Sequence, residues 1–139
     1  MSFVLKPKHP ITTNVSSTMT VDSDGFTAIV SCRFVDTDSP EYGQPYHDFA
    51  CKFLSKFIID KIKIWGVDKY GRCLVDAFAG DKNVGEEMVR AGLAWAISPK
   101  YRQLEREARR AKRGLWKEEN PVPPWEYRDK HERVSRKDV

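Results

Sequence analysis

Residues 61–79, KIKIWGVDKYGRCLVDAFA, combine two strand patterns with a turn pattern between them. Both outer segments, KIKIWGV and CLVDAFA, contain the β-branched and aromatic side chains that are enriched in strands. Asp68 and Gly71 occupy the first and fourth positions of the connecting segment, as in a type I turn. We therefore expect a hairpin in which Arg72 directly follows the turn.

The segments before this hairpin indicate further strands and then a helix. Residues 26–35, FTAIVSCRFV, place an apolar side chain at every second position and Arg33 on the opposite face. Residues 11–22 are rich in Thr and Val without a helical period, which predicts another strand. Asp22 and Gly25 stand at the first and fourth positions of a type I turn signature, so we expect a turn between the two strands at residues 22–25. Residues 46–59 repeat apolar side chains at helical spacing, so we expect a helix there.

The segments after the hairpin indicate two more helices. Asn83 followed by Glu86 resembles a capping box at the start of a short helix, and Gly92 is suited to its end. Residues 101–114 combine an inward-facing apolar stripe with a charged outer face, which predicts a longer helix. Short strands set among helices indicate an α+β fold. We expect a five-stranded OB-fold β-barrel with three helices.

The length of 139 residues is typical of one domain. We expect an N-terminal extension over residues 1–11, the folded domain over residues 12–128 and a charged flexible tail over residues 129–139. The tail is expected because this last segment has almost no apolar side chains. Residues 119–125, ENPVPPW, contain too many prolines for a helix or a central strand and should pack as an extended arm.

Composition limits the classes of function. No apolar run approaches the roughly 18 to 20 residues that cross a bilayer, so we expect no membrane insertion. We also expect a monomer. The first residues lack the long apolar segment of a secretory signal. This fits a cytoplasmic protein, or a secreted or periplasmic one whose leader was removed. The net charge of +4 favours a polyanionic partner such as nucleic acid, although a basic protein without such a partner has the same charge.

Cysteine and histidine do not suggest a metal centre. The chain has three residues of each kind, and they are too scattered for a CxxC motif or a histidine triad. We expect buried cysteines and locally bonded surface histidines. These residues are Cys32, Cys51, Cys73, His9, His47 and His131.

Charged side chains gather in residues 32–45, CRFVDTDSPEYGQP, which hold Arg33, Asp38 and Glu41 close together in the chain. With Arg72 they could form a site for phosphodiester hydrolysis. A carboxylate takes the proton from water, arginines grip the phosphate oxygens, and a hard cation bound to carboxylate oxygens can bridge the phosphate. A solvated acidic loop without chemistry is the alternative.

Several strings in the same order resemble the thermonuclease family, whose domain is the staphylococcal-nuclease-like domain. They are VDSDGFTAIVSCRFVDTDSPEYGQPY, VDKYGR, MVRAGLAWA, LEREARRAKRGLW and NPVPPWEYR, and together they cover roughly residues 12 to 128. The fold of this family is an OB barrel with three helices, which agrees with the elements expected above.

The resemblance implies a role for each matching residue. It assigns Arg33 and Arg72 as the catalytic arginines and Glu41 as the general base. It assigns Asp38 as a calcium ligand and the next residue, Ser39, as a provider of a backbone carbonyl to Ca²⁺. The activity it implies is metal-dependent hydrolysis of DNA, RNA or both, with little sequence specificity.

The resemblance also implies substrate contacts. Lys69 and Tyr70 match positions near the phosphate of a bound nucleotide, and Tyr101 matches a nucleotide-stacking tyrosine in a looser register. A row of arginines on the helix over residues 101–114 could follow the phosphates of a nucleic acid, or could simply be solvated and paired with glutamates. This row comprises Arg102, Arg106, Arg109, Arg110 and Arg113.

One departure from the family pattern concerns the metal. A second calcium-binding aspartate precedes the catalytic strand in the family, and the corresponding position here falls near residues 14–17, which contain no acid. The loss of one carboxylate should weaken calcium binding. Two hypotheses follow. The protein is a nuclease with a weak or altered metal dependence, or it is a catalytically weakened module of the same fold that binds nucleic acid or protein.

Overall fold

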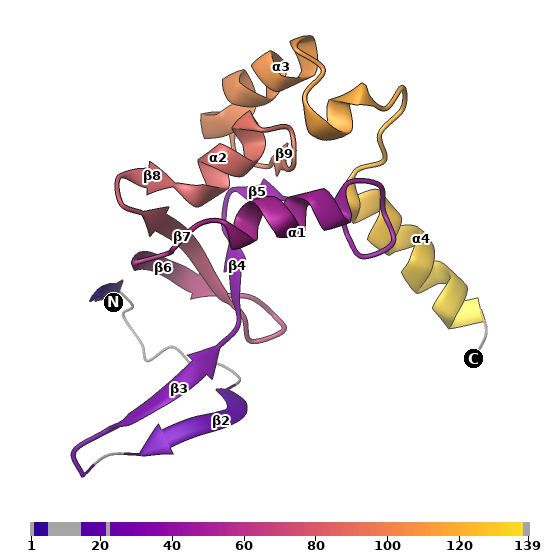
Figure 1. Ribbon diagram of the computed structural model, residues 1–139. Helices are drawn as coiled ribbons and strands as arrows, with labels where there is room; N and C mark the ends of the chain where they lie inside the picture. The colour runs from indigo at the N-terminus through magenta and orange to yellow at the C-terminus, as the bar shows by residue number, and fades with distance from the viewer. Residues whose placement is uncertain (1, 6–14, 22, 138–139) are drawn as a thin grey trace.

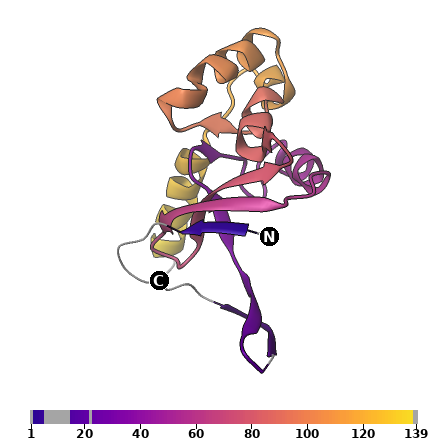
Figure 2. The ribbon, with the colours of Figure 1, turned by 90° about the vertical axis from the view of Figure 1, so that its left-hand side faces the viewer.

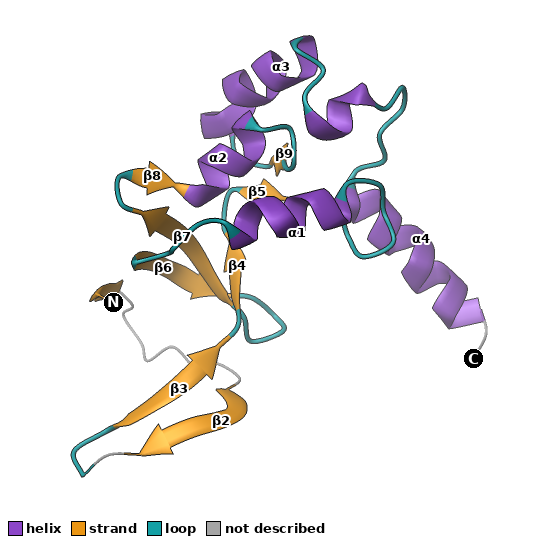
Figure 3. Cartoon of the chain, viewed as in Figure 1, coloured by secondary structure: helices purple, strands orange, loops and turns teal. Residues whose placement is uncertain are grey.

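The fold is given by a computed structural model of the 139-residue chain, which describes residues 2–5, 15–21 and 23–137. The described residues form an α+β structure in which the longer strands lie to one side of the helices, while two of the shortest strands lie among the helices (Figures 1 and 3). The strands are β1 (Ser2–Leu5), β2 (Val15–Val21), β3 (Phe26–Val30), β4 (Cys32–Phe34), β5 (Thr37–Asp38), β6 (Lys61–Val67), β7 (Cys73–Ala79), β8 (Lys82–Asn83) and β9 (Trp95–Ala96). The α-helices are α1 (His47–Ser55), α2 (Val84–Arg90), α3 (Arg102–Arg110) and α4 (Pro124–Lys137).

The hairpin expected from residues 61–79 is confirmed. Strands β6 and β7 pair in antiparallel register, with Ile64 opposite Val75. The backbone N–H of Gly71 donates to the carbonyl of Asp68 at 3.0 Å and closes the turn. Cys73, Val75 and Ala77 point into a buried cluster because they share one face of β7.

Strands from distant parts of the sequence extend this hairpin into a five-stranded sheet. Strand β1 pairs with β6 in parallel and β4 pairs with β7 in parallel, while the short β8 pairs with β7 in antiparallel register. The strand expected over residues 26–35 is divided at Ser31, whose carbonyl accepts a hydrogen bond from the N–H of Cys73 at 2.9 Å. Among the described strands, β3 then pairs only with β2, and this second hairpin extends beyond the sheet in both ribbon views (Figures 1 and 2).

The α+β class is confirmed, whereas the detail of a five-stranded barrel with three helices is not. Among the described residues the strands form separate sheets without closing into a barrel, and there are four α-helices. The geometric reason lies at the edge of β6. Strand β1 occupies that edge, and no ladder in the described part of the chain joins it to the hairpin of β2 and β3.

Helix α2 begins and ends as its sequence predicts. The side chain of Asn83 accepts a hydrogen bond from the N–H of Glu86 at 3.2 Å, which satisfies a free donor of the first turn. At the other end Gly92 adopts φ +74°, and the N–H of Leu93 donates to the carbonyl of Met88 at 2.9 Å. Any Cβ at Gly92 would collide with the carbonyl of Arg113, so only glycine fits this contact.

Three apolar clusters hold the elements together. One joins α1 to α2, a second joins α2 to the sheet, and a third packs the tryptophans Trp95 and Trp116 edge to face at 4.6 Å beside Ala108 of α3. The helix expected over residues 101–114 is shorter than predicted, because 3₁₀ turns at Pro99–Tyr101 and Gly114–Lys117 flank α3. The cysteine prediction holds only for Cys73, since Cys32 and Cys51 are exposed.

The C-terminal segment differs from the expected tail. Residues 118–123 form the extended arm that the prolines predict, and α4 then begins at Pro124, a residue favoured in the first turn of a helix. The structure is therefore helical over most of the segment for which we expected a frayed tail. None of the helices in the described ranges has the length and apolar character that a membrane span requires. The domain boundaries and the monomeric state stay predictions.

Candidate active site

The loop after β4 brings an acidic side chain to the base of a cleft. Strand β5 pairs with β9, so that Asp38 lies opposite Trp95, and the carbonyl of Asp36 accepts a hydrogen bond from the N–H of Ile97 at 2.9 Å. These contacts hold the loop on both sides of Asp38. The Asp38 side chain is only 7% exposed, and the Nη2 atom of Arg33 lies 3.4 Å from its Oδ2 atom.

The next turn presents Glu41. The N–H of Glu41 donates to the side-chain oxygen of Gln44 at 2.8 Å, and the N–H of Gln44 donates to the carbonyl of Glu41 at 2.9 Å. A ring nitrogen of His47 lies 2.9 Å from the carbonyl of Pro40 and ties this turn to the start of α1. The backbone around Glu41 is therefore fixed by reciprocal bonds, although its carboxylate is 38% exposed.

The turn between β6 and β7 positions Arg72 through Asp68. One oxygen of Asp68 accepts from the backbone N–H groups of Tyr70 and Arg72 at 2.9 Å each, and the other accepts from Nε of Arg72 at 2.8 Å. Burial tends to raise the pKa of Asp68, but the hydrogen bonds from these two backbone groups and the Arg72 guanidinium outweigh it and hold the pKa below its usual value.

Helix α4 contributes a third arginine to the same place. The guanidinium of Arg128 binds both oxygens of Asp38, with distances of 3.3 Å from Nη1 to Oδ1 and 2.8 Å from Nη2 to Oδ2. Its Nη1 atom also donates to Oε1 of Glu41 at 2.6 Å. Hydrogen bonds to Asp38 are the largest reason that the pKa of Arg128 is raised above its ordinary value. Arg128 therefore stays charged between the two acids.

These groups line one open cleft of about 920 Å³ between the loops and α4. Arginine and lysine side chains are as numerous around it as aspartate and glutamate side chains. Its lining residues are Arg33, Asp38, Ser39, Pro40, Glu41, Tyr42, His47, Lys69, Tyr70, Arg72, Trp125, Arg128, Asp129 and Glu132.

The structure brings seven of the eight predicted site residues to this cleft. Tyr70 is well placed to meet a ligand, since it is 56% exposed. Tyr101 is the exception. It is 2% exposed, it packs in the cluster that joins α1 to α2, and it does not line the cleft. A buried ring offers no face for stacking on a base. The other seven are Arg33, Asp38, Ser39, Glu41, Lys69, Tyr70 and Arg72.

The donor set in this arrangement does not fit a calcium ion. Calcium takes six to eight oxygen ligands, with carboxylates foremost. Both oxygens of Asp38 and one oxygen of Glu41 are engaged by Arg128. Within the ranges that the structure describes, no group of three or more His, Cys, Asp or Glu side chains is placed to hold a metal ion. The position expected to lack a carboxylate, residues 14–17, has no described side chain, so that prediction stays open.

Sequence comparisons identify the family. Residues 31–118 match the family model described as staphylococcal nuclease homologue, which covers more than half of the chain. The chain therefore belongs to the staphylococcal nuclease homologue family, as its motifs predict, and the domain of this family is an OB-fold. Helix α4 lies beyond the matched range.

Relatives from bacteria and plants support this assignment. An Escherichia coli O157:H7 protein described as an uncharacterized endonuclease is 38% identical over 108 residues, which cover 71% of each chain. The staphylococcal-like nuclease CAN1 of Arabidopsis thaliana is 38% identical over 105 residues, which cover 69% of this chain and 32% of that protein. A Haemophilus influenzae protein, also described as an uncharacterized endonuclease, is 31% identical over 107 residues, which cover 71% of this chain and 60% of that protein.

Sequence reasoning missed Arg128 as a member of the site. A signal was available, since Arg128 ends the NPVPPWEYR string that contributes to the family resemblance. Trp125, Arg128 and Glu132 are also spaced to share one helical face, and all three line the cleft. The low apolar content of this segment predicts a tail instead. A prediction from apolar content ignores charged side chains that pair with acids elsewhere in the fold.

Proposed function

We propose that this protein hydrolyses phosphodiester bonds of DNA, RNA or both, with little sequence specificity. The observation that carries the proposal is the convergence of Arg33, Arg72 and Glu41 on one open cleft, although they come from three separate segments. Family membership supports the same activity, because the relatives named above include nucleases. Basic and aromatic side chains at the rim, Lys69 and Tyr70, suit the phosphate and base of a nucleotide.

The proposed reaction is an attack of water on the scissile phosphorus. Glu41 takes a proton from the water while the oxygen of that water forms a bond to phosphorus. The bond to the leaving oxygen then breaks, and that oxygen takes a proton from solvent. Arg128 engages Oε1 of Glu41, so Oε2 is the oxygen that would receive the proton. Arg33 and Arg72, rather than Arg128, would contact the negative charge that develops on the phosphate oxygens.

The guanidinium groups of Arg33 and Arg72 would grip the phosphate oxygens. Each guanidinium has five N–H donors in a fixed fork. Arg72 uses its Nε donor on Asp68, which leaves its two terminal nitrogens for a phosphate. Donors that are already positioned before the reaction stabilise added negative charge without a cost of reorganisation at that moment.

Calcium binding is a separate part of the proposal. The resemblance to thermonucleases predicts a weakly held Ca²⁺ at Asp38 with help from the carbonyl of Ser39, and such binding would require Arg128 to release the carboxylate of Asp38. The reaction described above does not depend on this ion for any step. We also keep as proposals that the protein acts as a monomer and that it works either in the cytoplasm or, after removal of a leader, outside it.

A digestion assay tests the activity. Purified wild type, Glu41→Gln, Arg72→Ala and the control Lys117→Ala would be incubated with supercoiled plasmid and with single-stranded RNA, each with calcium or with a chelator. Loss of the base should lower the rate by roughly 10²-fold or more, and Lys117→Ala, at an exposed position outside the cleft, should cleave as wild type does. Equal cleavage by all four proteins would reject the proposal, since it would indicate a contaminating nuclease.

A second function has an observation in its favour. Arg128 already pairs with Asp38 and Glu41, as expected of a structural network rather than of a catalytic one. A non-catalytic module that binds nucleic acid or protein would need no free base. Fluorescence anisotropy with labelled DNA and RNA distinguishes the two functions, because the module would bind without any cleavage on prolonged incubation.

A further inference from the structure

Arg128 occupies the space between Asp38 and Glu41 that a metal ion would need. Its guanidinium lies within hydrogen-bond distance of both acids, and it reaches them from a helix that is 87 to 90 residues distant in the sequence. The planar fork of a guanidinium matches the two oxygens of a carboxylate, and here it does so at Asp38. The result is a fixed positive charge at the base of the cleft.

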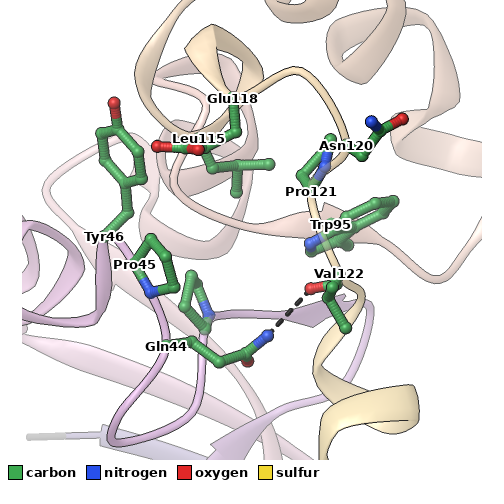
Figure 4. Close-up of a pocket in the computed structure, with 10 residues that line it drawn as sticks. Gln44, Pro45, Tyr46, Trp95, Leu115, Glu118, Asn120, Pro121 and Val122 are labelled. Atoms are coloured by element: carbon green, nitrogen blue, oxygen red, sulfur yellow. Dashed lines mark hydrogen bonds between the residues drawn. The ribbon is translucent and has the colours of Figure 1, made fainter.

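The segment that precedes Arg128 is docked by several contacts rather than by this ion pair alone. The side chain of Gln44 is 9% exposed and donates to the carbonyl of Val122 at 2.9 Å (Figure 4). Pro124 is fully buried, and Trp125 meets Trp95 edge to face at 5.5 Å. The start of α4 is therefore fixed on the loop that carries Glu41.

A small cavity marks the junction between this loop and the arm. It has a volume of about 100 Å³ and is bounded on one side by Gln44 and Tyr46 and on the other by Asn120 and Val122. In Figure 4 the residues of the arm and those of the loop face each other across this space, and Trp95 lies on the side of the arm, beside Pro121 and Val122. The arm is thus seated on the loop, which positions Arg128 before any ligand arrives.

The charge balance of the cleft depends on Arg128. Cationic and acidic side chains are equally numerous around the cleft, so removal of this one arginine leaves a net negative lining. An acidic cleft attracts cations, and the oxygens of Asp38 would lose a strong bidentate donor. A divalent ion and the guanidinium need the same oxygens and carry charge of the same sign, so both cannot occupy this place.

We propose that Arg128 is the resident cation of this site and that it excludes divalent metal ions from the pair Asp38 and Glu41. Metal binding and the pairing of Arg128 are mutually exclusive. The inference builds on the proposed function because it concerns the same cleft, but it is a statement about ion binding and can fail while the nuclease proposal stands. It also accounts for the poor fit of calcium to the donor set described above.

Isothermal titration calorimetry with calcium chloride tests the proposal. Wild type, Arg128→Gln and the control Arg102→Gln would be titrated at the same ionic strength, with Arg102 chosen as an exposed arginine of α3 outside the cleft. Arg128→Gln should bind Ca²⁺ at least tenfold more tightly than wild type, and Arg102→Gln should match wild type. The gain should disappear in the double variant Arg128→Gln with Asp38→Asn.

Equal or weaker calcium binding by Arg128→Gln would overturn the proposal. Circular dichroism and thermal unfolding would show whether this variant is folded. If it is not, Arg128→Lys decides, because lysine keeps a charge but loses the bidentate fork. The Arg128→Lys variant should bind Ca²⁺ severalfold more tightly than wild type does, and the lack of any gain in affinity would reject the inference. Plasmid cleavage by wild type is measured separately, so a failed titration does not count against the nuclease.

Discussion

Two arginines of the cleft are held in opposite ways. Arg72 is fixed by Asp68, four residues before it, within a single turn. Arg128 is fixed by Asp38 and Glu41, which precede it by 90 and 87 residues. These side chains meet because the arm before α4 is docked on the loop that carries the two acids. The first arrangement forms with the hairpin itself. The second forms only when the sheet, the loop and α4 are all assembled, so a substitution in it tests whether the whole fold is in place.

The largest effect should come from Asp38→Asn, because this change removes the partner of two arginines from a nearly buried position. We expect the free energy of unfolding to fall by about 3 kcal/mol, since guanidinium groups are left facing a neutral amide. Urea unfolding measures this, with Asp81→Asn in the exposed turn between β7 and β8 as the control. A loss no larger than that of the control would mean that the long-range cluster adds no stability.

Gln44→Ala should have the next largest effect. The side chain donates to the carbonyl of Val122 and accepts from the N–H of Glu41, so its loss leaves two partly buried backbone groups without partners. We expect a decrease of about 2 kcal/mol in unfolding free energy. Gln103→Ala on the exposed face of α3 is the matched control. If both variants unfold at the same urea concentration, the arm does not depend on this glutamine.

Gly43→Ala should have a smaller effect that is specific to the arm. Gly43 adopts φ +94°, and a Cβ there would lie 2.6 Å from the hydroxyl of Tyr127. The backbone strain should cost about 1 kcal/mol, and the displaced tyrosine should shift α4. Gly71→Ala in the hairpin turn, at φ +80°, carries similar strain outside the arm. Only Gly43→Ala should change the fluorescence of the tryptophans around Trp125, and an unchanged spectrum would contradict this.

The smallest effect should come from Asp68→Asn, and it should depend on pH. Because the pKa of Asp68 is lowered in the folded protein, its carboxylate stabilises the fold above the unfolded pKa of about 4. This contribution is lost as the pH falls through the lowered pKa. The difference in melting temperature between wild type and Asp68→Asn should therefore be present at neutral pH and vanish at strongly acidic pH. A difference that is constant with pH would show that the charge of Asp68 is unimportant.

The same contrast explains what the sequence could predict. The hairpin, its turn and the cap at Asn83 depend on residues at most a few positions apart, and the structure confirms them. Seven of the eight residues that the family motifs indicate line the cleft, whereas Tyr101 packs in the interior, and the roles of these residues stay predictions. The detail of a closed five-stranded barrel is not confirmed among the described residues, because β1, a distant segment, occupies the edge of β6.

The helical state of α4 could not be found from apolar periodicity. Its anchors are a buried proline, an edge contact between Trp125 and Trp95, and the pairing of Arg128 with two acids. Of these three anchors, a pattern of hydrophobic side chains indicates only the contact between the two tryptophans. A search for charged residues at helical spacing, together with unpaired acids elsewhere in the chain, would have been needed.

Helix α4 follows the part of the chain that matches the family model, and it contributes one wall of the cleft. The sheet and the loop that carry Arg33, Glu41 and Arg72 are complete before this helix begins. Changes in the last segment would therefore leave the strand pairings of the sheet in place. A protein with another segment in place of α4 would keep the loops that carry Arg33, Glu41 and Arg72 but would lack the positive charge of Arg128 between Asp38 and Glu41.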